Sequence, residues 1–510
     1  MTAPAGPIDP RRGVLTAATR AQALDALASE VVDVLVVGGG VTGTGIALDA
    51  ASRGLSVALV EKSDLAHGTS RWSSKLVHGG LRYLATYDWD LVLESARERH
   101  VLLTRTAPHL VRPLPMVVPL SVDVPRRDAL LVDVGQRLAE GFRLWAGTRP
   151  RHLPRPSRMS VEQTVRALPA VRRDGLRGGL CNWDGQLEDD ARLVVALART
   201  AAAHGARIVT RARAESVDGT GATVVDELTG ATLRIAARHV LNATGVWADV
   251  LSPGTRLAPS KGTHVVLPAA VLGHPSAAMT VPVPGESNRY VFALPHGDGI
   301  VHVGLTDDPI ASVPDVPRAE EHEIRFLLEV LSHGLEVPLS RSDVIGSFAG
   351  VRPLLAGAEG PTADLSRRHA VVRGDHGAWT VLGGKLTTYR RMAQDAVDLL
   401  TDAPCRTAHL PLLGAVGRVP PGVPDRLVRR YGAEAGDVAA LAGADRSLLE
   451  QVAPGVPVLG VELVWGVVAE GALDVEDLLE RRTRLSLVDG WAEAGRPAAE
   501  RALQEAAVSR

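Results

Sequence analysis

The chain of 510 residues is 45% hydrophobic and 22% charged, which is typical of a globular protein with two or three domains. Its 58 acidic and 56 basic residues nearly cancel, so the composition does not favour nucleic acid as a partner. Two cysteines, Cys181 and Cys405, are too few for a disulfide framework, and they favour a reducing compartment. The sequence also has no apolar stretch of membrane-spanning length and no signal-peptide core near the start. We therefore expect a cytoplasmic protein without a transmembrane helix or a bound metal.

The basic residues are strongly biased toward arginine. Of the 56, only four are lysines, at positions 62, 75, 261 and 385. Ammonium and guanidinium groups are not chemically interchangeable, so a lysine that remains in such a background is a candidate functional residue.

The chain begins with a nucleotide-binding pattern. Residues 14–30 predict a short amphipathic helix, and the β-branched run at 31–37 predicts a buried strand. A glycine-rich turn at 38–43, a small-residue helix at 44–53 and a second strand at 55–60 follow. This order is a β-α-β unit of about 30 residues, as the dinucleotide-binding fold requires.

The glycine turn has the spacing GxGxxG, with Gly38, Gly40 and Gly43. The first glycine permits the tight turn, the second lets the backbone approach a pyrophosphate, and the third lets helix and strand pack closely. Glu61 ends the second strand, 23 residues after Gly38, where a carboxylate can accept hydrogen bonds from a ribose. NAD and FAD share this motif. Its position near the N-terminus, and a later strand ending in residues 243–245 (Ala-Thr-Gly), favour FAD.

Later segments divide the chain into domains. Strand patterns at 207–210, 239–243 and 379–382 resemble the first domain, while 262–306 is a separate strand-rich block. We therefore predict an α/β fold: a discontinuous Rossmann-like FAD-binding domain, an inserted α+β substrate-cap domain and a C-terminal helical domain. The predicted boundaries are 1–30 for an N-terminal extension, 31–110, 180–255 and 345–402 for the FAD-binding domain, 111–179 and 256–344 for the cap, and 411–510 for the helical domain.

Several longer motifs resemble one known family. Residues 75–84, KLVHGGLRYL, resemble a segment of the FAD-dependent glycerol-3-phosphate dehydrogenases. Further resemblances are found in KGTH at 261–264, GVRPL at 350–354, GGKLTTYR at 383–390 and ERRTRL at 480–485. The similarity runs in order from about residue 14 to 490.

The resemblance implies an activity and its partners. Aerobic members of this family oxidise sn-glycerol 3-phosphate to dihydroxyacetone phosphate and pass the electrons through FAD to a membrane quinone. The resemblance thus implies FAD as cofactor, glycerol 3-phosphate as substrate, a quinone as acceptor, and peripheral contact with the inner face of the cell membrane. Whether the chain forms a homodimer is left open.

A phosphorylated alcohol requires cations for the phosphate and a base for the hydroxyl proton. The cation candidates are Arg82, Arg352, Arg367 and Lys385, and by resemblance they bind the substrate with Tyr83 beside them. The register at Arg367 is open, because Arg368 follows directly.

For the base we prefer His264, which lies on a probable strand three residues after Lys261. The alternative is that His264 is a core histidine satisfied by a neighbour. The predicted catalytic residues are His264, Arg352 and Lys385.

Cofactor contacts are predicted around the two glycine turns. Gly383 and Gly384 precede a helix beginning near Leu386, whose backbone N–H groups can stabilise a reduced flavin. The predicted cofactor-binding residues are Gly38, Gly40, Gly43, Glu61, Thr69, Ser70, Ser74, Lys75, Leu76, His78, Gly79, Gly80, Ala243, Thr244, Gly245, Gly384, Lys385, Leu386 and Thr387. His67, before Gly68, raises the alternative of a covalent flavin link, although we prefer a noncovalent one.

One predicted helix has an apolar face suited to a membrane surface. Leu131, Val134, Leu138, Phe142 and Trp145 recur at helical spacing. The predicted basic flank consists of Arg137, Arg143, Arg149, Arg151, Arg155 and Arg158. The alternative is that the apolar face packs on the sheet of the cap domain.

Three other functions are compatible with parts of this pattern. The nearest is a glycerol-3-phosphate oxidase that uses O₂ and releases H₂O₂. An amine or amino-acid oxidase of the same architecture would need a carboxylate clamp and has no use for several convergent cations. A flavin-binding regulatory or RNA-modification protein would not need the full set of cations.

Overall fold

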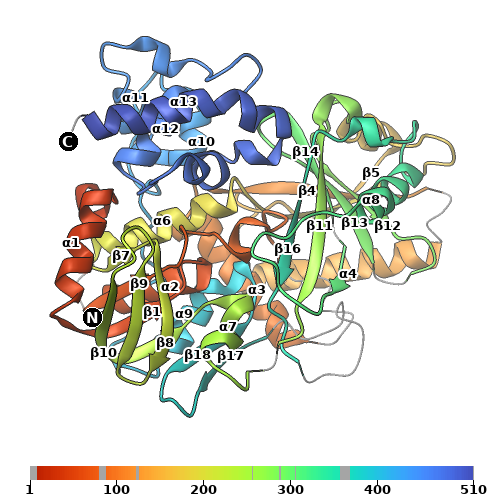
Figure 1. Ribbon diagram of the computed structural model, residues 1–510. Helices are drawn as coiled ribbons and strands as arrows, with labels where there is room; N and C mark the ends of the chain where they lie inside the picture. The colour runs from red at the N-terminus through yellow and green to blue at the C-terminus, as the bar shows by residue number, and fades with distance from the viewer. Residues whose placement is uncertain are drawn as a thin grey trace.

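Two β-sheets and a helical C-terminal region form the computed structural model, which describes residues 9–79, 88–121, 126–255, 257–286, 289–304, 306–356 and 368–508 (Figure 1). None of the helices in these ranges is both long and apolar enough to cross a membrane.

The first sheet is the predicted nucleotide-binding sheet. Its strand order is β17-β18-β10-β1-β2-β7, and β9 pairs with both β10 and β8. The pairs β18-β10, β10-β1, β1-β2 and β2-β7 are all parallel. The strands are β1 (Val31–Val37), β2 (Val57–Val60), β7 (Arg207–Val209), β8 (Ala212–Asp218), β9 (Gly221–Asp226), β10 (Thr232–Asn242), β17 (His369–Arg373) and β18 (Trp379–Gly383).

Both faces of this sheet are covered, as parallel strands require. On one face α2 (Val41–Ser52) packs against α6 (Asp190–Ala203) and α9 (Tyr389–Val397). The opposite face packs on α1 (Ala17–Leu27) and on β8 and β9. Small residues permit this close packing, since a Cβ added to Gly45 of α2 would lie 2.8 Å from the Tyr389 ring.

The second sheet runs in the order β15-β11-β14-β13-β12-β4-β6-β3, with β16 paired to β11 and β5 paired to β6. Its strands are β3 (Leu76–Val77), β4 (Val111–Pro119), β5 (Ser157–Met159), β6 (Gly179–Leu187), β11 (Ser260–Pro268), β12 (Ala278–Pro282), β13 (Tyr290–Pro295), β14 (Ile300–Gly304), β15 (Asp308–Pro309) and β16 (Gly346–Arg352).

Helices flank the second sheet as well. An apolar core joins α8 (Glu321–His333) to β11, β12, β13 and β14. Among the described residues before 260, the other α-helices are α3 (Trp89–Val101), α4 (Arg126–Trp145), α5 (Val161–Ala167) and α7 (Ala248–Leu251).

The C-terminal region is helical, as predicted, and lies above α6 in Figure 1. It consists of α10 (Asp425–Tyr431), α11 (Ala435–Ala440), α12 (Gly460–Val468) and α13 (Asp489–Val508). A π-helical turn, Asp477–Arg482, contacts α6 of the nucleotide-binding domain.

The structure places two predicted domain boundaries differently. Residues 180–187 and 346–352 fall within the ranges predicted for the FAD-binding domain, but β6 and β16 are strands of the second sheet. β16 pairs with β11, and β6 pairs with β4. The sheet that a strand joins depends on partners far along the chain, which its own residue pattern does not reveal.

Candidate active site

A cavity of about 1960 Å³ is lined by segments from both sheets. Its walls include the β1–α2 turn, residues 68–78, the end of β10, strands β11 and β16, and the turn at 383–387. These are the segments in which the sequence predicts the functional residues.

The β1–α2 turn has the geometry of a dinucleotide-binding turn. Gly38 adopts φ +112°, a conformation that side chains with a Cβ rarely adopt. A Cβ on Gly43 would lie 1.9 Å from the Gly38 carbonyl oxygen, so only glycine fits there. The N-cap of α2 is Gly40, which supplies no side-chain cap, and the Val41 N–H instead donates to Ser70 Oγ at 2.9 Å.

Glu61 lies against this turn, as its spacing predicts. Its Oε2 accepts a hydrogen bond from the Gly39 N–H at 2.6 Å, and its Oε1 accepts one from the Ser63 N–H at 2.9 Å. Burial raises the pKa of Glu61, and the two backbone donors oppose that rise. The carboxylate lines the cavity and keeps further lone pairs for another donor.

The end of β10 contacts the same turn. The Ala243 N–H donates to the Val37 carbonyl at 2.8 Å, and a Cβ on Gly38 would lie 2.6 Å from the Ala243 oxygen. Thr244 and Gly245 follow and line the cavity.

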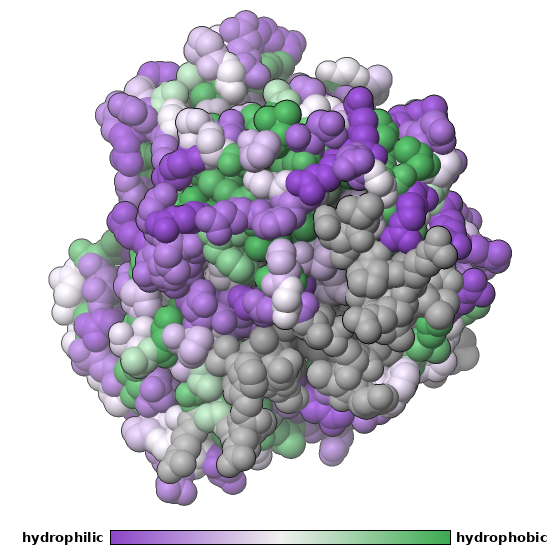
Figure 2. Space-filling view, turned by 90° about the vertical axis from the view of Figure 1, so that its right-hand side faces the viewer, coloured by the Kyte–Doolittle hydropathy of each residue, from purple (hydrophilic) through white to green (hydrophobic). Residues whose placement is uncertain are grey.

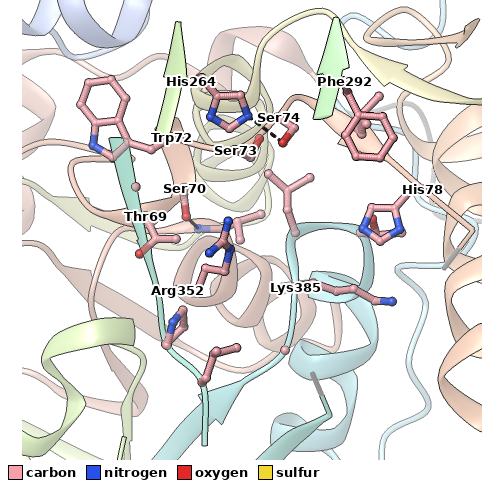
Figure 3. Close-up of a pocket in the computed structure, with 18 of the residues that line it drawn as sticks. Thr69, Ser70, Trp72, Ser73, Ser74, His78, His264, Phe292, Arg352 and Lys385 are labelled. Atoms are coloured by element: carbon pink, nitrogen blue, oxygen red, sulfur yellow. Dashed lines mark hydrogen bonds between the residues drawn. The ribbon is translucent and has the colours of Figure 1, made fainter. Parts of the chain in front are cut away.

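His264 lies on β11, where it is buried and lines the cavity (Figure 3). Its Nε2 lies 2.9 Å from Ser74 Oγ, and its ring stacks on Phe348 at 4.7 Å between centroids. The Nδ1 atom is buried and has no hydrogen-bond partner among the described residues. Burial, and then the charges of Lys75 and Arg352, lower the pKa of His264 well below its ordinary value. The imidazole is therefore neutral at physiological pH.

Arg352 ends β16, and backbone and side-chain acceptors orient it. Its Nη1 donates to Asp307 Oδ1 at 2.9 Å and to Ser260 Oγ at 3.2 Å, while its Nη2 donates to the Thr306 carbonyl at 2.9 Å. Gly262 makes room for it, because a Cβ there would lie 2.1 Å from Arg352 Nη2. Figure 3 shows the guanidinium in the middle of the view, in the cavity.

Lys385 enters the cavity from the second glycine turn. Gly383 and Gly384 have φ values of +69° and +78°, and the predicted helix begins with the turn Leu386–Thr388, followed by α9. Lys385 Nζ donates to Ser95 Oγ of α3. In Figure 3 the ammonium lies on the His78 side of the cavity, apart from Arg352.

Most of the predicted site residues line this cavity. They are Gly38, Gly40, Glu61, Thr69, Ser70, Ser74, Leu76, His78, Ala243, Thr244, Gly245, His264, Arg352, Gly384, Lys385, Leu386 and Thr387. Gly80, Arg82, Tyr83 and Arg367 lie outside the described residues.

Three predicted cofactor residues are not among those that line the cavity: Gly43, Lys75 and Gly79. Gly43 packs inside the turn, and the Gly79 N–H donates to Asp184 Oδ1 at 3.0 Å. Lys75 is buried, with its Nζ 3.3 Å from Asp190 Oδ2 and 4.7 Å from the centre of the Phe348 ring. Its side chain therefore points behind the cavity wall.

His67, the residue considered for a covalent flavin link, also lies outside the lining set. Its Nε2 lies 3.3 Å from Asp315 Oδ2. Burial, and then the charge of Arg71, lower its pKa.

Helix α4 carries part of the predicted apolar face on its surface. Val134 and Leu138 are exposed and line the cavity, and Trp145 is 58% exposed. Phe142 is half-buried, with its ring 6.0 Å from the Trp89 ring. Leu144, which the predicted face did not include, is 59% exposed. The side chain of Leu131 lies outside the described residues. The right-hand side of Figure 1, seen face-on in Figure 2, shows hydrophobic residues in separate patches among hydrophilic ones.

One member of the predicted basic flank is not at the surface. Arg143 is buried, and it donates to Glu140 Oε2 at 2.6 Å and to the Thr148 carbonyl. Its charge is therefore neutralised within the protein. Helical spacing alone did not reveal that the loop after α4 folds over this side chain.

Sequence reasoning missed the residues that orient the predicted ones. Asp307 and Thr306 hold Arg352, and Phe348 supports His264. Only long-range pairing brings them together, so no local spacing could identify them. Trp72 and Phe292 also line the cavity, and no motif predicted them.

The residues present fit FAD. The closely packed glycine turn leaves no Cβ in the path of a pyrophosphate, and Glu61 lies beside it with acceptor capacity for a ribose hydroxyl. A second pair of left-handed glycines, Gly383 and Gly384, faces the same cavity from the end of β18, at the same carboxyl edge of the parallel strands. The cavity is also larger than the roughly 300–1,000 Å³ usual for a small-molecule site.

Comparisons with known proteins agree with this fit. A family model described as FAD dependent oxidoreductase matches residues 33–390. A second model, described as the C-terminal domain of alpha-glycerophosphate oxidase, matches residues 383–508. Fold, cavity and family model together define an FAD-dependent oxidoreductase.

Named relatives narrow the class. Glycerol-3-phosphate dehydrogenase 1 of Mycobacterium tuberculosis is 50% identical over 497 residues, which cover 94% of this chain and 96% of that protein. The X-ray structure of the glycerol-3-phosphate dehydrogenase from Bacillus halodurans complexed with FAD has a TM-score of 0.73 at 28% identity, and covers 97% of each chain. The structure of L-alpha-glycerophosphate oxidase from Mycoplasma pneumoniae has a TM-score of 0.57 at 21% identity, and the match covers 75% of this chain and 99% of that one. At this identity the match indicates a shared fold alone. The chain belongs to the glycerol-3-phosphate dehydrogenase family of FAD-dependent oxidoreductases.

Proposed function

We propose that this protein oxidises sn-glycerol 3-phosphate to dihydroxyacetone phosphate, with FAD as hydride acceptor and a membrane quinone as the final acceptor. The observation that carries the proposal is the meeting of a dinucleotide turn, two cations and a neutral buried histidine in one cavity. The names of the relatives support the same substrate.

Arg352 binds the substrate phosphate in this proposal. A guanidinium presents paired donors to phosphate oxygens, and Asp307, Ser260 and the Thr306 carbonyl already fix its orientation. Lys385 adds a second cation, because its flexible four-carbon stem can swing away from Ser95. Arg82, Arg367 and Tyr83 stay sequence-based predictions for the same clamp.

His264 accepts the proton of the substrate hydroxyl at C2. A base must be unprotonated before the reaction, and burial keeps this imidazole neutral. Ser74 holds the ring through Nε2, and Phe348 fixes its plane. Arg352, whose charge helps to lower the pKa of His264, also favours negative charge developing on the substrate oxygen.

The two glycine turns and Glu61 hold the cofactor. When bound, FAD supplies the hydride acceptor of the reaction. The backbone at Leu386 offers an N–H group at the start of a helical segment, where a partial positive charge stabilises an anion. The Gly384 N–H donates instead to the Arg368 carbonyl at 3.3 Å.

The surface near the cavity favours a quinone over O₂ as acceptor. The part of the lining formed by Met116, Val118, Met279, Val281 and Val283 is apolar, and α4 beside it adds Val134 and Leu138. Exposed Leu144 and Trp145 continue along the helix, so an apolar acceptor could reach the cavity from a bilayer surface. The alternative is an oxidase, which the family description of the C-terminal segment keeps open.

The substrate is tested with the FAD-loaded enzyme under anaerobic conditions. Glycerol 3-phosphate should bleach the flavin absorbance within a single turnover, whereas glycerol and amino acids should not. Bleaching by an amino acid alone would favour an amino-acid oxidase, and no bleaching by glycerol 3-phosphate would contradict the proposal.

The acceptor is tested separately, in air and with a soluble quinone. Quinone reduction without H₂O₂ release is the expected result. Stoichiometric H₂O₂ with no stimulation by quinone would establish the oxidase instead.

A further inference from the structure

A six-residue segment, Thr69–Ser74, touches three different parts of the active site. Ser70 Oγ accepts the Val41 N–H of the dinucleotide-binding helix at 2.9 Å. Thr69 Oγ1 donates to the Val351 carbonyl at 2.6 Å, one residue before Arg352. Ser74 Oγ lies 2.9 Å from His264 Nε2. A displacement of this segment would therefore disturb the cofactor turn, the cation and the base together.

The C-terminal region fixes the chain just before this segment. Asp64 is fully buried, and its Oδ2 accepts from Arg481 Nε at 2.7 Å and from Arg482 Nη1 at 2.8 Å. Arg482 Nη2 donates to Asp64 Oδ1 at 2.9 Å, so that pair is two-pronged. Burial opposes ionisation, yet the guanidinium groups of Arg482 and Arg481 hold the pKa of Asp64 below its ordinary value.

The middle of the segment is held from the same side. Arg71 is buried and pairs with Glu480, which belongs to the π-helical turn of the C-terminal region. Arg484 Nη2 donates to the Arg71 carbonyl at 2.5 Å. Arg484 itself adopts φ +67°, a costly conformation that aims its side chain back at the segment.

The end of the segment is anchored on the start of α6. Asp190 Oδ2 accepts from the Ser73 N–H at 2.9 Å and from Ser73 Oγ at 2.8 Å, and Lys75 Nζ lies 3.3 Å away. Arg484 Nη2 lies 3.8 Å from the other oxygen of Asp190. The same arginine thus contacts the middle of the segment and its anchor.

Burying this many charged groups between two domains costs desolvation free energy. A buried ion pair often stabilises the folded state no more than apolar packing does, but it requires a specific geometry of its two partners. Here each contact fixes a backbone or side-chain position behind the cavity wall.

From these contacts we infer that residues 480–484 of the C-terminal region act as a clamp that positions the segment Thr69–Ser74. Arg482 and Arg484 are its positioning residues, and they touch neither cofactor nor substrate in this role. The inference concerns cofactor retention and does not depend on the identity of the substrate.

The test uses two charge-preserving variants of the holoenzyme, Arg482→Lys and Arg484→Lys. Lysine keeps the charge but cannot reproduce the two-pronged contacts with Asp64 or the reach to the Arg71 carbonyl. The control is Arg496→Lys, which alters an exposed ion pair with Glu476 in the same C-terminal region. Flavin fluorescence measures the rate of FAD release, visible circular dichroism measures the flavin environment, and thermal unfolding measures stability.

We expect each clamp variant to release FAD at least tenfold faster and to shift the visible circular dichroism bands, while the control matches the parent protein. Lower unfolding temperatures with unchanged FAD release and unchanged bands would overturn the inference, because a merely structural ion pair behaves in that way. If Arg482→Lys yields no folded holoenzyme, Arg484→Lys decides, since it leaves the Asp64 pairs intact.

Discussion

At Arg352, one side chain that second-sheet residues orient carries the substrate assignment. The sequence singled it out among 52 arginines by a motif, and the structure adds the acceptors that orient it. An oriented guanidinium loses little conformational freedom when it binds phosphate, so it contributes to both binding and positioning.

Replacing Arg352 by alanine should therefore lower kcat/KM for glycerol 3-phosphate by about 10- to 150-fold, the equivalent of a charge-assisted hydrogen bond of about 1.5–3 kcal/mol. We expect both a higher KM and a lower kcat, measured by steady-state kinetics. The control is Arg155→Ala, at a guanidinium that is 71% exposed. An unchanged KM in a folded Arg352→Ala enzyme would remove Arg352 from the clamp.

Lys75 provides a prediction about pH. Burial lowers its pKa to about 8 from the ordinary 10.5, although Asp190 opposes this. Between these two pH values the unfolded chain binds more protons than the folded one, so the contribution of Lys75 to stability rises with pH. The rise amounts to about 3 kcal/mol across that window.

The measurement compares Lys75→Met with the parent protein by denaturation at pH 7.5 and pH 10. The parent should gain stability relative to Lys75→Met when the pH is raised from 7.5 to 10. Parallel pH profiles for the two proteins would contradict this prediction.

At the scale of elements, the β1–α2 turn is the part of the site under the tightest steric constraint. Gly43→Ala would bring a methyl group within 1.9 Å of the Gly38 carbonyl oxygen and force the turn open. We expect a loss of bound FAD of tenfold or more, measured from the flavin absorbance of the purified protein. Gly141→Ala is the matched control, because a Cβ there in α4 would meet no neighbour. Full FAD content in Gly43→Ala would contradict the proposed cradle.

Helix α4 gives a second prediction for an element. Trp145→Glu combined with Leu144→Glu should abolish co-sedimentation with anionic phospholipid vesicles, because the change places two charges on its exposed apolar end. Leu228→Glu, at a leucine 54% exposed on the hairpin between β9 and β10, should have no effect. Unchanged vesicle binding by the double variant would show that α4 is not the contact.

The elements differ in how well the sequence predicted them. The β-α-β unit depends on local signals, namely a β-branched run, three spaced glycines and a terminal glutamate, and the structure confirms it. By contrast, β6 and β16 join the second sheet through partners far along the chain, and Arg143 is buried by a loop that follows its helix. Non-local contacts of that kind leave no periodic pattern.

At the scale of the whole molecule, the four lysines also separate what local sequence predicts from what only non-local contacts decide. The arginine-rich composition marked all of them as candidate functional residues, and Lys62 and Lys385 do line the cavity. Lys75 and Lys261 are instead buried behind it, paired with Asp190 and with Glu320 and Glu323. Sequence resemblance placed these lysines near the cavity. Only the fold distinguishes a lysine that lines the cavity from one that supports its wall.

The whole-molecule organisation also assigns a role to the C-terminal region, for which the sequence offered none. It packs on α6 and pairs with the segment that lines the cavity. The proposed site is therefore completed by residues more than 400 positions apart in the chain.

The central claim is that one cavity binds the cofactor, the phosphate and the reacting hydroxyl. A crystal structure of the holoenzyme, reduced and soaked with glycerol 3-phosphate, tests it most directly. We expect the phosphate on Arg352 and Lys385 and the C2 hydroxyl within hydrogen-bond distance of His264. A phosphate bound elsewhere, with His264 remote from the C2 hydroxyl, would contradict it.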